Sequence, residues 1–190
     1  MATNCNDLIR GMNPDCSAVN KVGGVDKTVY IGKKANMTFT TDSNGYYSAI
    51  SMATVGSLPS YLLKFTGKRD KNSWTAPLTA GENVNTWNHT AIMALYYSNP
   101  TELDTIEKLC NADDLVVIMQ GNDDKFIVLG AEKGLNASAG EGGSGILLND
   151  TTAYMVTLTG EQKVMPKMFS TTPSASLATN IAYLDAIATY

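Results

Sequence analysis

The sequence has little charge, and arginine is scarcest among its charged residues. Lysine and arginine together number 14 against 18 acidic residues in a chain of 190, which gives a net charge of −4, and the only arginines are Arg10 and Arg69. A sequence-specific nucleic-acid reader ordinarily carries a basic, arginine-rich face, so the composition argues against that class. Hydrophobic residues make up 44% of the chain, which predicts one globular domain rather than a disordered chain.

Long hydrophobic runs are also missing. The longest, Ala91–Tyr97, has seven residues, whereas a helix that crosses a membrane needs about 20. The opening segment Met1–Asp7 has neither a basic start nor an apolar stretch, so no secretory signal peptide is predicted. We expect a soluble protein without a membrane partner.

Histidine and cysteine are too few for most catalytic and metal centres. A Ser-His-Asp or Cys-His centre would have to use His89, the only histidine, and we predict instead that His89 is packed in a strand or at an interface. Cys5, Cys16 and Cys110 form no Cys-x-x-Cys pair and are predicted to be reduced thiols, with a Cys5–Cys16 bridge as the alternative. We predict no catalytic residue, no metal and no cofactor.

Strand patterns fill most of the chain. Alternating and β-branched runs predict strands at 28–31, 37–41, 46–55, 61–66, 74–78, 84–98, 115–120, 125–131, 152–159 and 163–169. Strands 61–66 and 74–78 are predicted to form a hairpin with a charged tip, and a second hairpin is predicted around Gly121–Asp124. The glycine-rich stretch Gly134–Gly145 is predicted to be a mobile loop, and Gly160–Gln162 a turn.

Two helices interrupt the strands. Asn99-Pro100 supplies an N-cap and a first-turn proline for a helix that ends at Asn111. A C-terminal helix follows the lead-in at Ser170–Ser176, with Leu177, Ile181 and Leu184 at helical spacing. A short helical segment is also predicted near Asp7–Met12.

Two motifs that could bind cofactors or metals have plainer explanations. Gly140–Gly145 spells G-x-G-x-x-G, but a dinucleotide site needs a helix directly after the glycines, and a strand pattern follows here. The pairs Asp113–Asp114 and Asp123–Asp124 adjoin turns, and neighbouring residues on a strand point to opposite faces. We predict that both pairs are solvated turns, and an enzyme with a carboxylate site is the least favoured class.

The only local basic cluster comprises Lys64, Lys68, Arg69 and Lys71. Three interpretations stay open: phosphate contacts, a solvated hairpin tip, and docking on the acidic surface of a neighbouring subunit, with Phe65 and Trp74 as apolar anchors. Few charges interrupt the predicted strands 46–55 and 84–98, so little opposes strand addition at their edges. We expect copies of the chain to join there.

Four segments carry a resemblance to a known family. They are Cys5–Gly11 (CNDLIRG), Gly23–Gly32 (GGVDKTVYIG), Val128–Leu135 (VLGAEKGL) and Val156–Glu161 (VTLTGE). Together with the order of predicted elements, they resemble small tail-tube-like virion proteins of tailed phages that infect Bacteroidetes, crAss-like phages included.

The resemblance implies a mainly β fold. It would be an antiparallel β-sandwich or barrel over residues 21–169 with one flanking helix, preceded by an N-terminal arm at 1–20 and followed by a C-terminal arm or helix at 170–190. The implied function is that of a structural protein of the virion tail, made in the host cytoplasm. Six subunits, or alternatively twelve, would close a ring whose inner wall is a continuous β-barrel, and DNA would pass through its lumen without sequence-specific binding.

Neighbouring tail rings are the further partners that the resemblance implies, and the ring itself is either part of the tail tube or a tail-barrel or connector ring. The predicted inter-subunit contacts are Phe65, Lys68, Arg69, Lys71, Trp74, Leu177, Ile181 and Leu184. The alternative function is a carbohydrate- or host-binding β-sandwich, such as a fibre or capsid decoration domain, which would need solvent-facing aromatic side chains around a shallow groove.

Overall fold

Strands dominate the structure, as the alternating patterns predict. The computed structural model describes residues 24–55, 58–66, 71–82, 84–97, 99–143 and 153–189. Its strands are β1 (Val25–Lys33), β2 (Met37–Thr41), β3 (Tyr47–Met52), β4 (Thr54–Val55), β5 (Leu58–Pro59), β6 (Leu62–Thr66), β7 (Ser73–Thr75), β8 (Leu78–Thr79), β9 (Thr86–Leu95), β10 (Leu115–Gly121), β11 (Phe126–Leu129), β12 (Asn136–Gly143), β13 (Ala153–Gln162), β14 (Lys167–Phe169) and β15 (Ala188–Thr189). The helices are α1 (Pro100–Cys110) and α2 (Leu177–Ala186), with a 3-10 turn at Lys34–Asn36.

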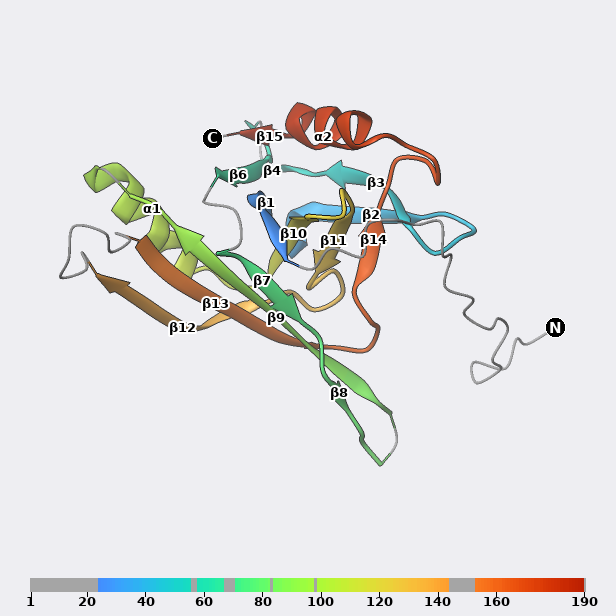
Figure 1. Ribbon diagram of the computed structural model, residues 1–190, viewed down its shortest axis with the longest axis horizontal. Coiled ribbons are helices and arrows are strands. Elements are labelled where there is room, and N and C mark those ends of the chain that lie inside the picture. Colours follow the sequence, from blue (N-terminus) through green and yellow to red (C-terminus); the bar gives the residue numbers. More distant parts are fainter. Residues whose placement is uncertain are drawn as a thin grey trace.

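The strands form two main sheets that lie in separate layers. The large sheet has the order β15-β6-β1-β10-β11-β14-β3-β2 and curls into a half-barrel. The small sheet has the order β12-β13-β9-β7, and β8 also pairs with β9. In Figure 1 the large sheet lies between α2 above and the small sheet below, and α1 lies at the left-hand end. The fold is therefore a mainly β structure with two flanking helices.

Each face of the large sheet is covered by its own hydrophobic core. On β1, Val29 and Ile31 belong to the core shared with the small sheet and α1, whereas Tyr30 belongs to the core shared with α2. On β10, Val117 lies on the first face and Val116 on the second. A strand buried on both faces reads as a continuous hydrophobic run, which explains the unbroken Leu115–Met119.

The turn between β11 and β12 is fixed to the small sheet by buried side chains. The fully buried Gln162 accepts hydrogen bonds from the backbone N–H groups of Glu132 (3.2 Å) and Lys133 (3.0 Å) and donates one to the carbonyl of Gly134 (2.8 Å). An amide that satisfies both its oxygen and its nitrogen in this way is stable in a core. We call Gln162 and His89, whose bonds are described below, the polar clamp.

A second buried amide lies where the chain crosses from the large sheet to the small one. The side chain of Asn72 donates to the carbonyl of Asp26 in β1 (3.2 Å) and accepts from the N–H of Ala94 in β9 (3.0 Å). One buried residue thus connects a strand of each sheet immediately before β7 begins.

The C-terminal helix is attached to the large sheet by packing and by polar contacts. Lys64 of β6 forms an ion pair with Asp185 (2.7 Å), and the hydroxyl of Tyr30 donates to the same carboxylate (2.7 Å). Although partial burial acts to raise it, these bonds hold the pKa of Asp185 below its usual value. The hydroxyl of Tyr183 accepts from the N–H of Ile50 and donates to its carbonyl.

The structure confirms two of the predicted helices and one of the two predicted hairpins. Asn99 caps α1 by accepting from the N–H of Glu102, and Ser176 caps α2 through Thr179. The hairpin around Gly121–Asp124 joins β10 to β11. The structure also has a turn at 42–45, in which the Asp42 carboxylate accepts from the N–H of Tyr46.

The predicted hairpin of strands 61–66 and 74–78 is wrong. β6 pairs with β1 and β15 in the large sheet, whereas β7 pairs with β9 in the small sheet. The alternation in 61–66 does give the faces of β6 correctly, since Leu62 is fully buried beside α2 while Leu63 lies on the other face. Alternation fixes which side chains share a face and leaves the partner strand open.

The predicted loop at Gly134–Gly145 is also wrong over its described part. Residues 136–143 form β12, which pairs with β13. A Cβ atom at Gly140 would lie 2.8 Å from the Tyr154 ring, and one at Gly142 would also overlap it. The glycines therefore give the Tyr154 ring room to lie across the strand. The turn predicted at Gly160–Gln162 is wrong as well, because β13 continues through these residues to Gln162.

Replacing Asn72 by alanine tests the crossing point. Asn72→Ala leaves the buried Ala94 N–H without this acceptor, so we expect the free energy of unfolding to fall by about 1–3 kcal/mol in urea denaturation. Asn88→Ala is the matched control, because Asn88 is exposed on β9, and its effect should stay within about 0.5 kcal/mol. Equal effects of the two substitutions would contradict the role given to Asn72.

Candidate assembly surfaces

The small sheet ends in an open strand. β12 is the outermost strand of this sheet among the described residues, and seven of its eight positions are exposed. Its only charged residue is Glu141, and it contains neither lysine nor proline. Charge and proline are the usual means by which proteins block an exposed edge, so β12 is an edge that can accept another strand.

The opposite edge of the small sheet is built from β7 and β8. Both strands pair with β9 on one side, through Ser73–Thr75 and through Leu78–Thr79. The strands predicted as edges, 84–98 and 46–55, are instead interior: β9 lies between β13 and β7, and β3 lies between β14 and β2. That prediction is wrong because a strand with few charges is equally typical of a sheet's interior.

A projecting hairpin leads away from the two sheets. We call residues 76–82 and 84–88 the arm; they include β8 and the start of β9, and Figure 1 shows them extending beyond the body of the molecule at the bottom of the view. Leu78 is 55% exposed and Val84 is 59% exposed. Glu82 is the only charged residue of the arm. The arm is thus a nearly uncharged projection with aliphatic side chains in solvent.

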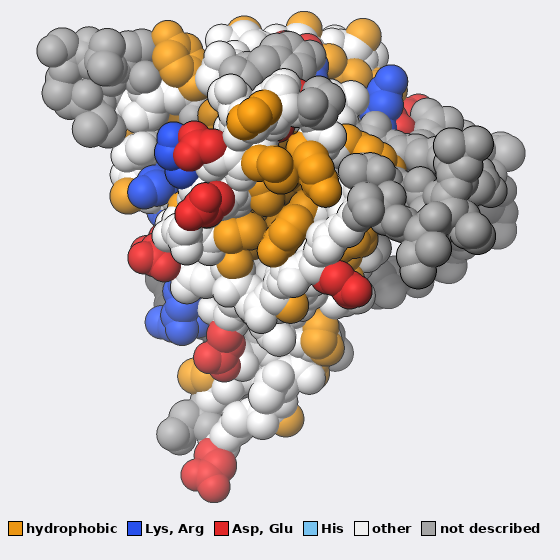
Figure 2. Space-filling model, turned by 90° about the vertical axis from the view of Figure 1, so that its left-hand side faces the viewer, with side chains coloured by type: hydrophobic (Ala, Val, Ile, Leu, Met, Phe, Trp, Pro, Cys, Tyr) orange, Lys and Arg blue, Asp and Glu red, His pale blue; other side chains and the backbone are white. Residues whose placement is uncertain are grey.

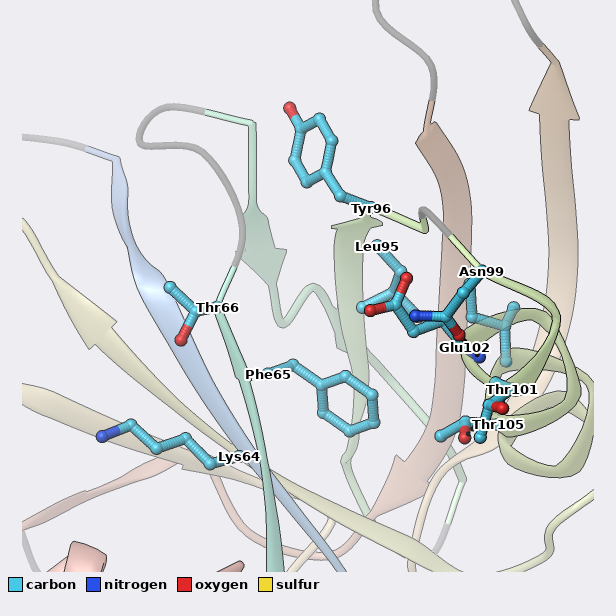
Figure 3. Close-up of a pocket in the computed structure, with 10 residues that line it drawn as sticks. Lys64, Phe65, Thr66, Leu95, Tyr96, Asn99, Thr101, Glu102 and Thr105 are labelled. Carbon is cyan, nitrogen blue, oxygen red and sulfur yellow. Dashed lines mark hydrogen bonds between the residues drawn. The ribbon is translucent and has the colours of Figure 1, made fainter. Parts of the chain in front are cut away.

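A groove runs between β6 and α1. It consists of two hollows that share Thr105, each with a volume of about 540 Å³. The first is lined by Phe65, Leu95 and Tyr96 and by the first turns of α1, and Figure 3 shows the Phe65 ring directed toward that helix. The second is lined by Ile31, Lys33, Tyr61, Leu63, Lys108, Leu109, Ala112 and Leu115, among others.

The groove is open because the small sheet stops short of β6. β1 and β10 contribute fully buried residues to the core between the sheets, whereas of β6 only Phe65 packs against it. Tyr61 is consequently 51% exposed and Leu63 is 40% exposed. Figure 2, which faces this end of the molecule, shows hydrophobic side chains gathered at a hollow beside charged ones.

The described residues among the predicted inter-subunit contacts are spread over β6, the crossing to β7, β7 itself and α2. Phe65 lies in the groove, and Trp74, which is 37% exposed, lies on β7 in the other sheet. Lys71 is exposed next to the crossing point, while Lys68 and Arg69 lie outside the described residues. Lys64, part of the same basic cluster, is engaged by Asp185.

The three predicted contacts on α2 lie against the chain's own large sheet. Leu184 is fully buried in the core beneath the helix, so its side chain has no surface to offer a second subunit. Leu177 and Ile181 are partly buried against the same core, and an inter-subunit role for them stays a prediction. Residues 170–189 therefore pack on the sheet that precedes them instead of extending away from it.

Two of the aspartates considered for catalysis or metal binding lie in turns, and the described glycines of the G-x-G-x-x-G motif lie in strand β12. Asp114 and Asp124 sit in turns with φ of 54° and 64°, and both are exposed. Among the described residues, no three His, Cys, Asp or Glu side chains are grouped to hold a metal ion. Gly140–Gly143 belong to β12, while Cys5, Cys16 and the predicted helix at 7–12 lie outside the described part. Burial raises the pKa of the Cys110 thiol.

His89 is packed, as predicted, and both of its ring nitrogens are engaged. Nδ1 accepts from the N–H of Gly130 (3.2 Å), so Nε2 carries the proton and donates to the carbonyl of Val164 (3.0 Å). Burial lowers the pKa of His89 despite the opposing effects of the Val164 bond and of Glu132. The neutral His89 ring is thus the second member of the polar clamp, which holds the β11–β12 turn in place.

Neither helix in the described part of the chain is long and apolar enough to span a membrane. The chain matches no family model, and no curated protein and no solved structure is significantly similar to it. Among the described residues, the edges of the small sheet, the arm and the groove are the features that bear on function.

The buried state of His89 predicts a pH dependence of stability. Because the folded-state pKa is lower than the unfolded value of about 6.5, the unfolded chain binds more protons between these two values. The free energy of unfolding should thus be highest above about pH 7 and should decline as the pH falls through about 6.5 toward the folded-state pKa. Chemical denaturation at steps from pH 7.5 to 5.5 measures this decline.

His89→Gln is the matched variant, because glutamine can donate and accept but does not titrate. We expect its stability to change less over the same pH range than that of the original chain. Identical pH profiles would show that the decline comes from other groups.

Proposed function

We propose that this protein is a structural protein that assembles with copies of itself, side by side, into a closed ring. The single observation that carries the proposal is the open strand β12, an eight-residue edge with one charge and no proline. An exposed edge of this length is a template for strand addition. A second copy of the chain is an occupant that is present wherever the protein is made.

The two edges of the small sheet favour a ring over a symmetric dimer. β12 lies on one side of the sheet, and β7 with β8 on the other. Pairing of one edge with the opposite edge of the next copy is a head-to-tail contact, and such contacts close into rings when the rotation between copies is suitable. The inner wall of the ring would then be a continuous sheet.

The virion role of this ring is supported by the resemblance of the sequence to tail-tube-like proteins. In that role the ring belongs to the phage tail, as part of the tail tube or as a tail-barrel or connector ring, and surrounds the DNA channel. Six subunits are the expected number and twelve the alternative. The net charge of −4 suits a channel wall that DNA passes without binding, since affinity for phosphates comes from basic side chains.

Binding of a carbohydrate or a host surface is the second candidate. The observation in its favour is the hollow of about 540 Å³ lined by Phe65 and Tyr96 together with Asn99, Thr101 and Glu102. Aromatic faces with a few polar groups are typical of small-molecule sites. A protein with this function would bind glycans as a monomer, whereas the proposed structural protein would assemble without them.

Lysine substitutions on β12 test the proposed edge. Ala139→Lys combined with Glu141→Lys places two positive charges on exposed positions of the strand, and lysine on an edge opposes strand addition. We expect the oligomer of the original chain to dissociate, with the association constant reduced by at least about tenfold, or 1.4 kcal/mol, in mass photometry and negative-stain images.

The charge-matched control is Ala178→Lys with Glu107→Lys, two exposed positions on the helices. This control should assemble like the original chain. A strictly monomeric original chain at high protein concentration would falsify the proposed function, and glycan binding by that monomer would support the second candidate.

A further inference from the structure

The large sheet also ends in an open strand, and only one of its two edges is long. β2 is the outermost strand on one side among the described residues, whereas β15 on the other side has two residues. β2 has the sequence MTFTT, without charge or proline, so it carries none of the usual features that block strand addition. We propose that β2 of one copy pairs antiparallel with β2 of a second copy about a two-fold axis.

The backbone of β2 directs hydrogen-bonding groups outward at alternate residues. The carbonyl of Asn36, just before the strand, and the N–H of Asp42, just after it, both bond toward the β3 side. The bonded side alternates from residue to residue along an antiparallel strand. Met37, Phe39 and Thr41 therefore direct their N–H and carbonyl groups away from β3, toward the position that a further strand would take.

These outward groups select one register of self-pairing. With Phe39 opposite Phe39 of the second copy, Met37 lies opposite Thr41, and all three outward positions meet outward positions of the partner. Registers centred on Thr38 or on Thr40 pair only two of the three. A slip by one residue would set outward positions against inward ones, so the backbone bonds would not form.

The side chains fit the same register. Met37 belongs to the core shared with α2, and Phe39 packs against that core, which leaves Thr38 and Thr40 exposed on the other face of the strand. In the register centred on Phe39, Thr38 of each copy lies directly opposite Thr40 of the other. Cross-strand threonine pairs of this kind stabilise antiparallel sheets.

Charge indicates that the partner strand is a second copy. Lys34 precedes β2 and Asp42 follows it. Antiparallel self-pairing sets Asp42 of each copy opposite Asn36 and near Lys34 of the other, and the two-fold axis makes this contact twice. Parallel pairing would bring like charges together. Because opposite charges orient the partners at an interface, the two ends of this edge complement each other.

The number of long edges decides the symmetry of the contact. The small sheet has an edge on each side and so permits the head-to-tail pairing proposed above. The large sheet has one long edge, which can meet only its own equivalent. A contact of this isologous kind is complete after two copies. β2 pairing therefore gives a dimer that does not depend on β12.

Cysteine cross-linking tests the register directly. A chain carrying Thr38→Cys is mixed with a chain carrying Thr40→Cys under mild oxidation. Opposed Cβ atoms of antiparallel strands are close enough for a disulfide, so we expect a mixed disulfide-linked dimer. Each variant alone is the matched control and should give no more dimer than the original chain with its three cysteines. More dimer in a single-variant sample than in the mixture would contradict the proposed register.

Charged substitutions test the pairing without a covalent bond. Thr38→Lys with Thr40→Lys sets each lysine opposite a lysine of the second copy, and like charges directly opposite are unfavourable. We expect the association constant of the dimer to fall at least about tenfold in mass photometry. Mixing this chain with one that carries Thr38→Glu and Thr40→Glu should restore a mixed dimer. The melting temperature should not change, because both positions are exposed.

The β12 variant separates this proposal from the proposed function. The cross-linking is repeated in a chain that also carries Ala139→Lys and Glu141→Lys, which should form no ring and still form the β2 dimer. Rings from the original chain without the mixed disulfide overturn the β2 proposal and leave the proposed function standing. The mixed disulfide in a chain that forms no ring has the opposite meaning. A strand of a different protein on this edge would give no cross-link between purified copies, which also overturns the proposal.

Discussion

The contact between the two sheets depends on a few buried polar side chains, and the exposed surfaces follow from it. Gln162 and His89 fix the β11–β12 turn, and Asn72 fixes the crossing to β7. The β11–β12 turn places β12 at one edge of the small sheet, and the crossing at Asn72 places β7 and the arm at the other edge. Buried amides that are fully satisfied specify one arrangement among several apolar packings, and here they specify where the open edges lie.

The sequence predicts those parts of the fold that short-range chemistry determines. Asn99 and Ser176 lie within three residues of the N–H groups that they cap, and the turn at Gly121–Asp124 needs only its own residues. The partner of β6 was not predictable in this way. Asn72 contacts Asp26 and Ala94, which are 46 and 22 residues away, and nothing in the local pattern indicates such contacts.

The prediction of the edge strands is wrong for a related physical reason. The segment Val84–Ser98 has few charges because β9 is covered by strands on both sides and by the core. Its low charge therefore does not indicate an unpaired edge. The real edge at 136–143 has the composition that predicts a loop, since glycine ordinarily weakens a strand. What stabilises these glycines in a strand is Tyr154, whose ring covers Gly140 and Gly142 from the neighbouring strand. A glycine run beside an aromatic strand partner is the signal that could have indicated β12.

The composition of β12 bears on how assembly could be specific. Strand addition to a glycine-rich edge uses backbone hydrogen bonds, which any extended segment can supply, so such an edge selects its partner poorly. Selection then has to come from side chains elsewhere on the molecule. The β2 edge is more selective, because Thr38 and Thr40 are exposed along it and Lys34 and Asp42 lie beyond its two ends. A chain of low charge can thus leave one edge unprotected, provided that its correct neighbours are recognised by side chains at a second place.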